Sequence, residues 1–151
     1  MKLIASSPNL IFRYNHKQVI PPVASRYLGS PVHPIHPKIA YMYEHRDKNT
    51  LWWRVSVAQL IQYKRVVRSW CARRVRIAVK QALQRHGYDQ LGSPLSTSPL
   101  AGQATLTGSL EVIIRQKVVT QNFETVQNDA NDLLTDILAQ RAKKLRPSRR
   151  L

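Results

Sequence analysis

The sequence is poor in cysteine and has no long apolar run, and each shortage excludes a class of protein. Its single cysteine, Cys71, cannot form a disulfide within the chain, so we expect a reducing compartment. One thiol also cannot build a cysteine-based zinc site. No apolar stretch approaches the roughly 18 residues that a membrane-spanning helix requires, so we expect no transmembrane segment.

Acidic residues are also scarce, with 8 Asp and Glu against 24 Lys and Arg and a net charge of +16 over 151 residues. Of these cations, 20 fall in three stretches, residues 1–43, 53–88 and 141–150, and none of the three contains an acid. Such a surface repels its own copies and attracts polyanions, so a homo-oligomer is not indicated. Nucleic acid is the first candidate partner, an anionic membrane surface the second and an acidic protein the third.

No catalytic or cofactor signature is present, since the sequence contains neither a P-loop nor a GxGxxG motif. His33 and His36 lie in an HPIHP segment, where the prolines disfavour the helix that would bring both onto one metal ion. Asp129, Asp132 and Asp136 share one helix face, which we interpret as solvated or as a docking surface for a basic protein. We therefore expect no enzyme, no cofactor and no metal site.

Residues 1–37 are predicted to form an extended basic arm, because six prolines interrupt them. The same acid-free, Ser-containing stretch is typical of an organelle-import segment, which Pro21 and Pro22 would limit to residues 1–20. The alternative is a basic extension that lies on RNA. The compartment we expect is the mitochondrial matrix, or otherwise the cytoplasm.

Residues 38–142 are predicted to form one α+β domain, followed by a basic tail over residues 143–151. Alternating apolar residues predict a short strand over 38–44 and a second strand or hairpin over 103–119, after an exposed loop over 88–102. Residues 51–55 would pair back as a hairpin or already be helical. The two predicted helices would pack on one face of a small antiparallel sheet or hairpin.

The longest helix is predicted over residues 56–86, with Ser56 and Gln59 as a capping box and Gly87 after its end. At about 100° per residue, one predicted core-facing line consists of Leu60, Val67, Cys71, Val75, Ala78 and Ala82, with Val66, Trp70 and Ile77 beside it.

A second amphipathic helix is predicted over residues 123–142, with Asn122 as its N-cap. Its apolar face is formed by Phe123, Val126, Ala130, Leu133, Leu134, Ile137 and Leu138.

The cations of the long helix and the tail are the predicted RNA-binding residues. A solvated helix face normally mixes acids with bases, because like charges one turn apart destabilise a helix. Here no acid offsets the repulsion, which favours an external polyanion whose phosphates the guanidinium groups bind in a bidentate manner. The predicted set is Arg54, Lys64, Arg65, Arg68, Arg73, Arg74, Arg76, Lys80 and Arg85, with Lys143, Lys144, Arg146, Arg149 and Arg150 in the tail.

Three aromatic residues, Trp52, Trp53 and Tyr63, lie beside cations and are candidates for stacking on bases. Packing against the core is the alternative that we favour for adjacent aromatic residues. No zinc-finger spacing and no RNA-binding motif of a known module accompanies them.

A compact body with basic extensions at both ends resembles the general layout of ribosomal proteins, although no specific family motif is present. We therefore expect a structural RNA-binding protein of a ribonucleoprotein particle, a mitochondrial ribosomal protein that binds rRNA phosphates and neighbouring proteins. The alternative is a mitochondrial assembly or scaffold factor that acts through protein contacts. DNA is a weaker candidate, since the long helix is followed by a loop and a strand and not by a helix-turn-helix.

Overall fold

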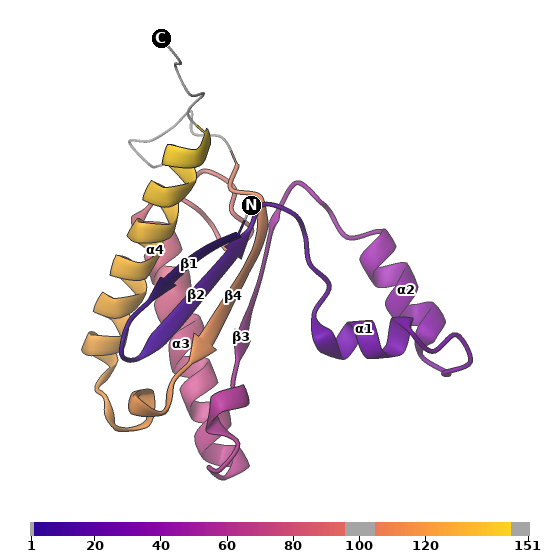
Figure 1. Ribbon diagram of the computed structural model, residues 1–151, viewed down its shortest axis with the longest axis horizontal. Helices are drawn as coiled ribbons and strands as arrows, with labels where there is room; N and C mark the ends of the chain where they lie inside the picture. The colour runs from indigo at the N-terminus through magenta and orange to yellow at the C-terminus, as the bar shows by residue number, and fades with distance from the viewer. Residues whose placement is uncertain (1, 96–104, 146–151) are drawn as a thin grey trace.

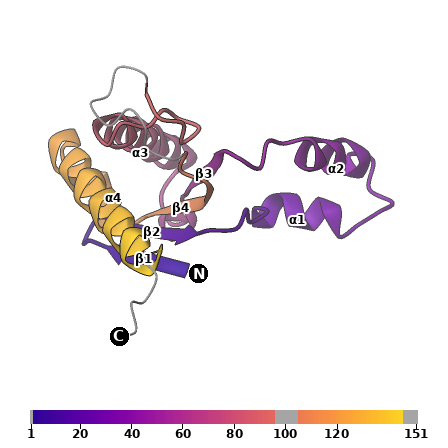
Figure 2. The same ribbon diagram turned by 90° about the horizontal axis from the view of Figure 1, so that it is seen from above.

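The computed structural model describes residues 2–95 and 105–145, and its fold is α+β, as predicted from the sequence. One four-stranded sheet has the strand order β1-β2-β4-β3, in which β3 and β4 are parallel and the other neighbours antiparallel. The strands are β1 (Lys2–Ser6), β2 (Leu10–Asn15), β3 (Leu51–Ser56) and β4 (Gly108–Ile114). Two long helices, α3 (Arg65–Arg85) and α4 (Phe123–Leu145), cover one face of this sheet (Figures 1 and 2).

The prediction of an extended arm over residues 1–37 is wrong, because residues 2–15 form two strands and residues 22–28 form a helix. Strands β1 and β2 form a hairpin that pairs with β4, and side chains alternating along it are buried in the core: Leu3, Ala5, Leu10, Phe12 and Tyr14. The prolines do not oppose this, because Pro8 lies in the turn between the strands. Residues 1–20, the candidate import segment, contain two of the four strands of the folded sheet.

The predicted helix over residues 56–86 begins nine residues later than expected, at Arg65. Residues 51–56 form β3, and Ala58–Leu60 form a 3-10 turn, so the proposed capping box at Ser56 does not exist. Strand β3 runs parallel to β4, from which more than fifty residues separate it, and a pairing so distant leaves no local sequence signal. The end of the helix is as predicted, with Gly87 at φ 84°.

The core lies between the two long helices and the sheet. Helix α3 contributes Cys71, Val75, Ala78 and Ala82, four members of its predicted core-facing line, and the thiol of Cys71 is buried. Burial raises the pKa of this thiol, while nearby Arg74 lowers it. Strand β4 is shorter than the predicted 103–119 segment, and residues 116–120 form a 3-10 turn.

Helix α4 agrees with its prediction and extends to Leu145. The backbone amide of Thr125 donates to Asn122 Oδ1 at 3.0 Å, which confirms Asn122 as the N-cap. Its predicted apolar face is buried at Val126, Ala130, Leu133, Leu134 and Ile137. No helix in residues 2–95 and 105–145 is long and apolar enough to cross a membrane.

A helical hairpin connects β2 to β3 and projects to one side of the sheet (Figures 1 and 2). It consists of α1 (Pro22–Leu28) and α2 (His36–Glu44), and Pro22 and Pro37 lie in their first turns, where a missing backbone donor costs little. The strand predicted over residues 38–44 is therefore helical, and the HPIHP segment begins a helix instead of remaining extended. Of the two helices only Ala24 is buried.

Candidate nucleic-acid interface

Four arginines gather along one flank of α3, beside the end of the edge strand β3. Arg65, Arg68, Arg73 and Arg76 line a groove of about 360 Å³, here called the arginine groove. Its other lining residues are Val55, Val57, Ser69 and Ala72.

Helical geometry explains how these arginines come together. Residues three or four apart in a helix lie on the same side, which brings Arg65 and Arg68, and likewise Arg73 and Arg76, next to each other. Four of the cations predicted to bind RNA therefore lie together on one surface of the helix. The apolar wall of the groove comes from Val55 in β3 and Val57 just after it. This wall was not predicted, because the sequence left residues 51–55 open between a hairpin and a helix and placed Val57 in the long helix.

The arginine groove has unused capacity for an anion. Arg68 Nε is buried and has no hydrogen-bond acceptor among the described residues. A buried charged donor without an acceptor is costly, and an anion bound in the groove would offset the charge of this guanidinium. In the described part of the chain, every ion pair involves Glu111, which lies on the opposite face of the sheet, so none neutralises the groove.

The remaining predicted cations are spread over three other places. Arg54 lies on the uncovered face of the sheet, and Arg74 donates to the backbone oxygen of Gln121 at 2.9 Å, a structural contact. Lys64 precedes α3, Lys80 is half-buried on it, and Arg85 is exposed at its end. Lys143 and Lys144 are exposed at the end of α4, whereas Arg146, Arg149 and Arg150 lie outside the described residues.

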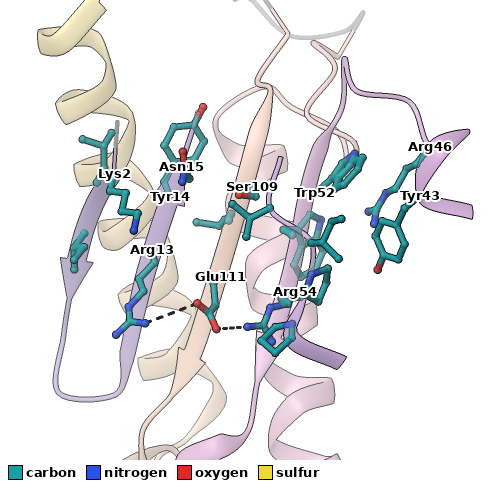
Figure 3. A pocket seen from close by; sticks show the side chains of 18 residues that line it. Lys2, Arg13, Tyr14, Asn15, Tyr43, Arg46, Trp52, Arg54, Ser109 and Glu111 are labelled. Atoms are coloured by element: carbon teal, nitrogen blue, oxygen red, sulfur yellow. Dashed lines mark hydrogen bonds and ion pairs between the residues drawn. The ribbon is translucent and has the colours of Figure 1, made fainter. Parts of the chain in front are cut away.

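A second, larger groove lies on the sheet face that α3 and α4 leave uncovered, and we call it the sheet groove (Figure 3). It measures about 740 Å³ and reaches the base of the helical hairpin at Tyr43 and Arg46. Its cations come from four segments of the chain: Lys2, Arg13, Arg46 and Arg54. Of these four, only Arg54 was predicted from the sequence, because the strands that place Lys2 and Arg13 here were not predicted.

Glu111 neutralises part of the sheet groove. Its carboxylate accepts a hydrogen bond from Arg54, its registered partner on β3, and lies 3.9 Å from Arg13 on β2 (Figure 3). Lys2 and Arg46 form no ion pair with a described carboxylate. The sheet groove therefore keeps a net positive charge, which is smaller than the sum of its four cations because Glu111 offsets part of it.

The aromatic candidates for base stacking pack against the protein. Trp52 is buried, and the Arg46 guanidinium lies 4.3 Å from the centre of the Trp52 ring. The indole N–H of Trp52 donates to the Asp47 carbonyl. Trp53 donates to the Gln90 carbonyl and, like Tyr63, packs against the core. The preferred interpretation of these residues as packing groups is thus confirmed.

No group of three or more His, Cys, Asp or Glu side chains within residues 2–95 and 105–145 could hold a metal ion. His36 Nδ1 lies 2.9 Å from the Tyr27 carbonyl, and the His33 ring packs edge-on against Tyr27. These contacts give both histidines a structural role in the hairpin.

Comparisons with known proteins place this chain in no family. No family model matches the sequence, and no curated protein is significantly similar to it. The solved structure of the Staphylococcus aureus RNase P protein is similar over 89% of this chain and 79% of that one, with a TM-score of 0.44 and 10% identity. Likeness of this degree assigns neither a family nor a function.

Proposed function

We propose that this chain is a structural RNA-binding protein of a ribonucleoprotein particle, without catalytic activity of its own. The observation that carries the proposal is the arginine groove, in which four arginines converge and no described carboxylate pairs with them. A guanidinium is charged at every physiological pH, and its fork of donors matches the oxygens of a phosphate. Backbone phosphates of folded RNA are the ligands that this surface fits best.

The sheet groove offers a second cationic surface to the same RNA. The exposed Lys143 and Lys144, at the end of α4, add a third contact region. Several basic surfaces on one small domain suit a protein embedded in folded RNA, so we propose the ribosome as the particle. We also propose the mitochondrial matrix as its compartment, because residues 1–43 contain no acid; the import signal would then be a segment that forms part of the fold.

A charge-reversal experiment tests the arginine groove. The variant Arg65→Glu with Arg76→Glu changes two exposed side chains, so the fold should be retained. We expect at least a tenfold loss of affinity for a structured RNA, and a salt slope lower by about one for each lost phosphate contact. The matched control, Arg26→Glu with Lys38→Glu, makes the same charge change on the helical hairpin and should bind nearly normally. Equal losses of affinity in both variants would contradict a specific site and show that the arginine groove contributes only through the net charge of the protein.

Sedimentation tests the particle. Tagged protein from a mitochondrial lysate should migrate with a ribosomal subunit on a sucrose gradient, and RNase should release it. A small complex that resists RNase would contradict the ribosomal proposal.

A second candidate function, an assembly or scaffold factor, is favoured by the helical hairpin. Its surface exposes Val23, Val32, Tyr41 and Met42, and such apolar groups are suited to a protein partner. This candidate predicts a complex that survives nuclease and is lost in the variant Met42→Asp, whereas Lys38→Asp on the same helix would leave it intact.

A further inference from the structure

A large aromatic side chain is exposed in the middle of the cationic helix. Trp70 is 46% exposed, although the apolar arc of α3 was expected to take it toward the core. Val66, one turn before it, is 79% exposed, and Ile77, two turns after it, is 43% exposed. The three residues form an apolar strip on the side of α3 away from the sheet, here called the Trp70 strip.

The position of the strip follows from the helix geometry. Each residue turns the helix by about 100°, so Trp70 points well away from the line that contains the buried Cys71, Val75 and Ala78. Helix α4 and the sheet cover only that line, since Val66, Trp70 and Ile77 remain outside the core. The strip thus has no partner among the described residues that would bury it.

The surroundings of Trp70 are cationic. The Arg74 guanidinium lies 4.3 Å from the centre of the indole ring, in a cation–π contact that orients the ring. Arg74 is itself held by its hydrogen bond to the Gln121 carbonyl, so the ring rests against a fixed group. Helix α3 contains no Asp or Glu over its whole length.

We propose that Trp70 binds an unpaired nucleobase of the RNA by stacking. The base would lie on the face of the indole opposite the Arg74 guanidinium. This inference rests on the proposed function, and it names the part of the RNA that the helix reads. An indole stacks on any base, because every base offers a π face. Charge complementarity selects RNA as the occupant, since the flanking arginines would bind the phosphates on either side of the stacked base.

The arginine groove and the Trp70 strip are continuous around the helix. Arg73 lines the groove and lies, by helical rotation, between Arg76 and Trp70, about 60° from each. A strand whose phosphates follow the groove would therefore bring an unstacked base onto the indole. We expect α3 to prefer RNA loops and bulges over uninterrupted duplex, in which the bases are stacked and inaccessible.

The test compares two RNAs, a hairpin with a uridine-rich loop and the same stem as a blunt duplex. Titration of the whole protein with the hairpin should quench its tryptophan fluorescence, and the duplex should quench it much less. The variant Trp70→Leu should lose this quenching and bind the hairpin about tenfold to hundredfold more weakly, with unchanged affinity for the duplex. Trp70→Phe should restore part of the affinity for the hairpin, because phenylalanine still stacks. Trp53→Phe, whose ring packs against the core, serves as the control for fluorescence and should retain the quenching.

Three outcomes would overturn the inference. Equal weakening of hairpin and duplex binding in Trp70→Leu would make the residue a general support of the helix. Unchanged hairpin binding in Trp70→Leu, with the Arg65→Glu, Arg76→Glu variant impaired, would reject the stacking site and leave the proposed function standing. Quenching by vesicles of anionic phospholipid but by neither RNA would identify a membrane surface and reject both proposals.

Discussion

The side-chain amide of Asn9 donates a hydrogen bond to Asp129 Oδ2 at 2.6 Å, joining the turn between β1 and β2 to helix α4. The hydroxyl of Ser7 donates to the same oxygen at 3.1 Å, and Ser7 Oγ in turn accepts from the backbone amides of Asn9 and Leu10. One carboxylate of the predicted acidic face therefore docks within the molecule. The N-terminal hairpin is attached to α4 by polar contacts as well as by its buried side chains.

Asp129→Ala should destabilise the protein by about 2–3 kcal/mol, because it removes a charged acceptor and leaves the buried Asn9 amide without a partner. Urea denaturation monitored by circular dichroism measures this loss. Asp132→Ala, an exposed neighbour on the same helix face, is the control and should change stability by less than about 0.5 kcal/mol. Equal effects of the two substitutions would contradict a specific role for the Asn9 contact.

Glu111→Gln should increase the affinity of the sheet groove for RNA. The change removes the charge that neutralises Arg54 and Arg13, so we expect a severalfold gain at low salt and a steeper salt dependence. Loss of the ion pairs should cost about 1 kcal/mol of stability. Filter binding over a range of salt concentrations measures the affinity.

The matched control for that experiment is Glu124→Gln, which makes the same charge change at an exposed position in the first turn of α4. If both substitutions raise the affinity equally, the gain reflects net charge and the sheet groove takes no part in binding.

Gly108→Ala should destabilise the protein by about 2 kcal/mol or more. Gly108 begins β4 at φ 110°, and a Cβ atom there would lie 2.3 Å from the backbone oxygen of Asn15. Gly29→Ala is the control, because its φ is −75° and its added Cβ would come no closer than 3.4 Å to a backbone oxygen. Thermal melts of the two variants should differ by several degrees, and similar melting temperatures would contradict the strain at Gly108.

Stability should decrease above pH 10, in part because of Tyr14. Burial raises the pKa of its phenol above the usual 10.0, an effect that Arg141 partly opposes. The folded state thus holds the phenolic proton more tightly than the unfolded chain, and this stabilisation is present below pH 10 and is lost as the pH rises. The phenol also donates to the Thr107 carbonyl, so Tyr14→Phe should be less stable at neutral pH. The difference between the two proteins should shrink at alkaline pH, and a constant difference in urea denaturation from pH 8 to 11 would contradict this account.

The sequence predicted best the elements whose signals are local. Helix α4 follows from its apolar spacing and from the Asn122 cap, both contained within its own residues. The end of α3 at Gly87 is equally local. The cationic flank was also predictable, because Arg65, Arg68, Arg73 and Arg76 lie on one regular helix and need no distant partner to come together.

The sheet was harder to predict, because its strands find their partners far along the chain. Strand β2 alternates buried Leu10, Phe12 and Tyr14 with less buried neighbours, a pattern that the six prolines of residues 1–37 obscured. Strand β3 is followed almost directly by the turn before α3, so its own sequence does not distinguish it from the start of that helix. Its pairing with β4 is what identifies it as a strand. The sheet groove depends on both strands, so its lining could not be assembled from the sequence.

The exposure of Trp70 shows a further limit of periodicity. An apolar arc drawn around α3 includes this residue, but α4 and the sheet together cover a narrower sector than the arc. How much of an amphipathic helix becomes buried depends on the elements that pack against it, and these are set by the tertiary structure.

The strand order has a consequence for how the protein is made. Strand β2 is synthesised early, but its inner neighbour β4 begins only at Gly108 and the covering helix α4 follows still later. At typical translation rates of about 5–20 residues per second, roughly 5 to 20 seconds pass between the synthesis of β2 and that of β4, and the apolar side of the first hairpin is uncovered during this time. During that interval Leu10, Phe12 and Tyr14 are available to other chains and to chaperones, so a nascent polypeptide stalled before β4 should be held by a chaperone or degraded.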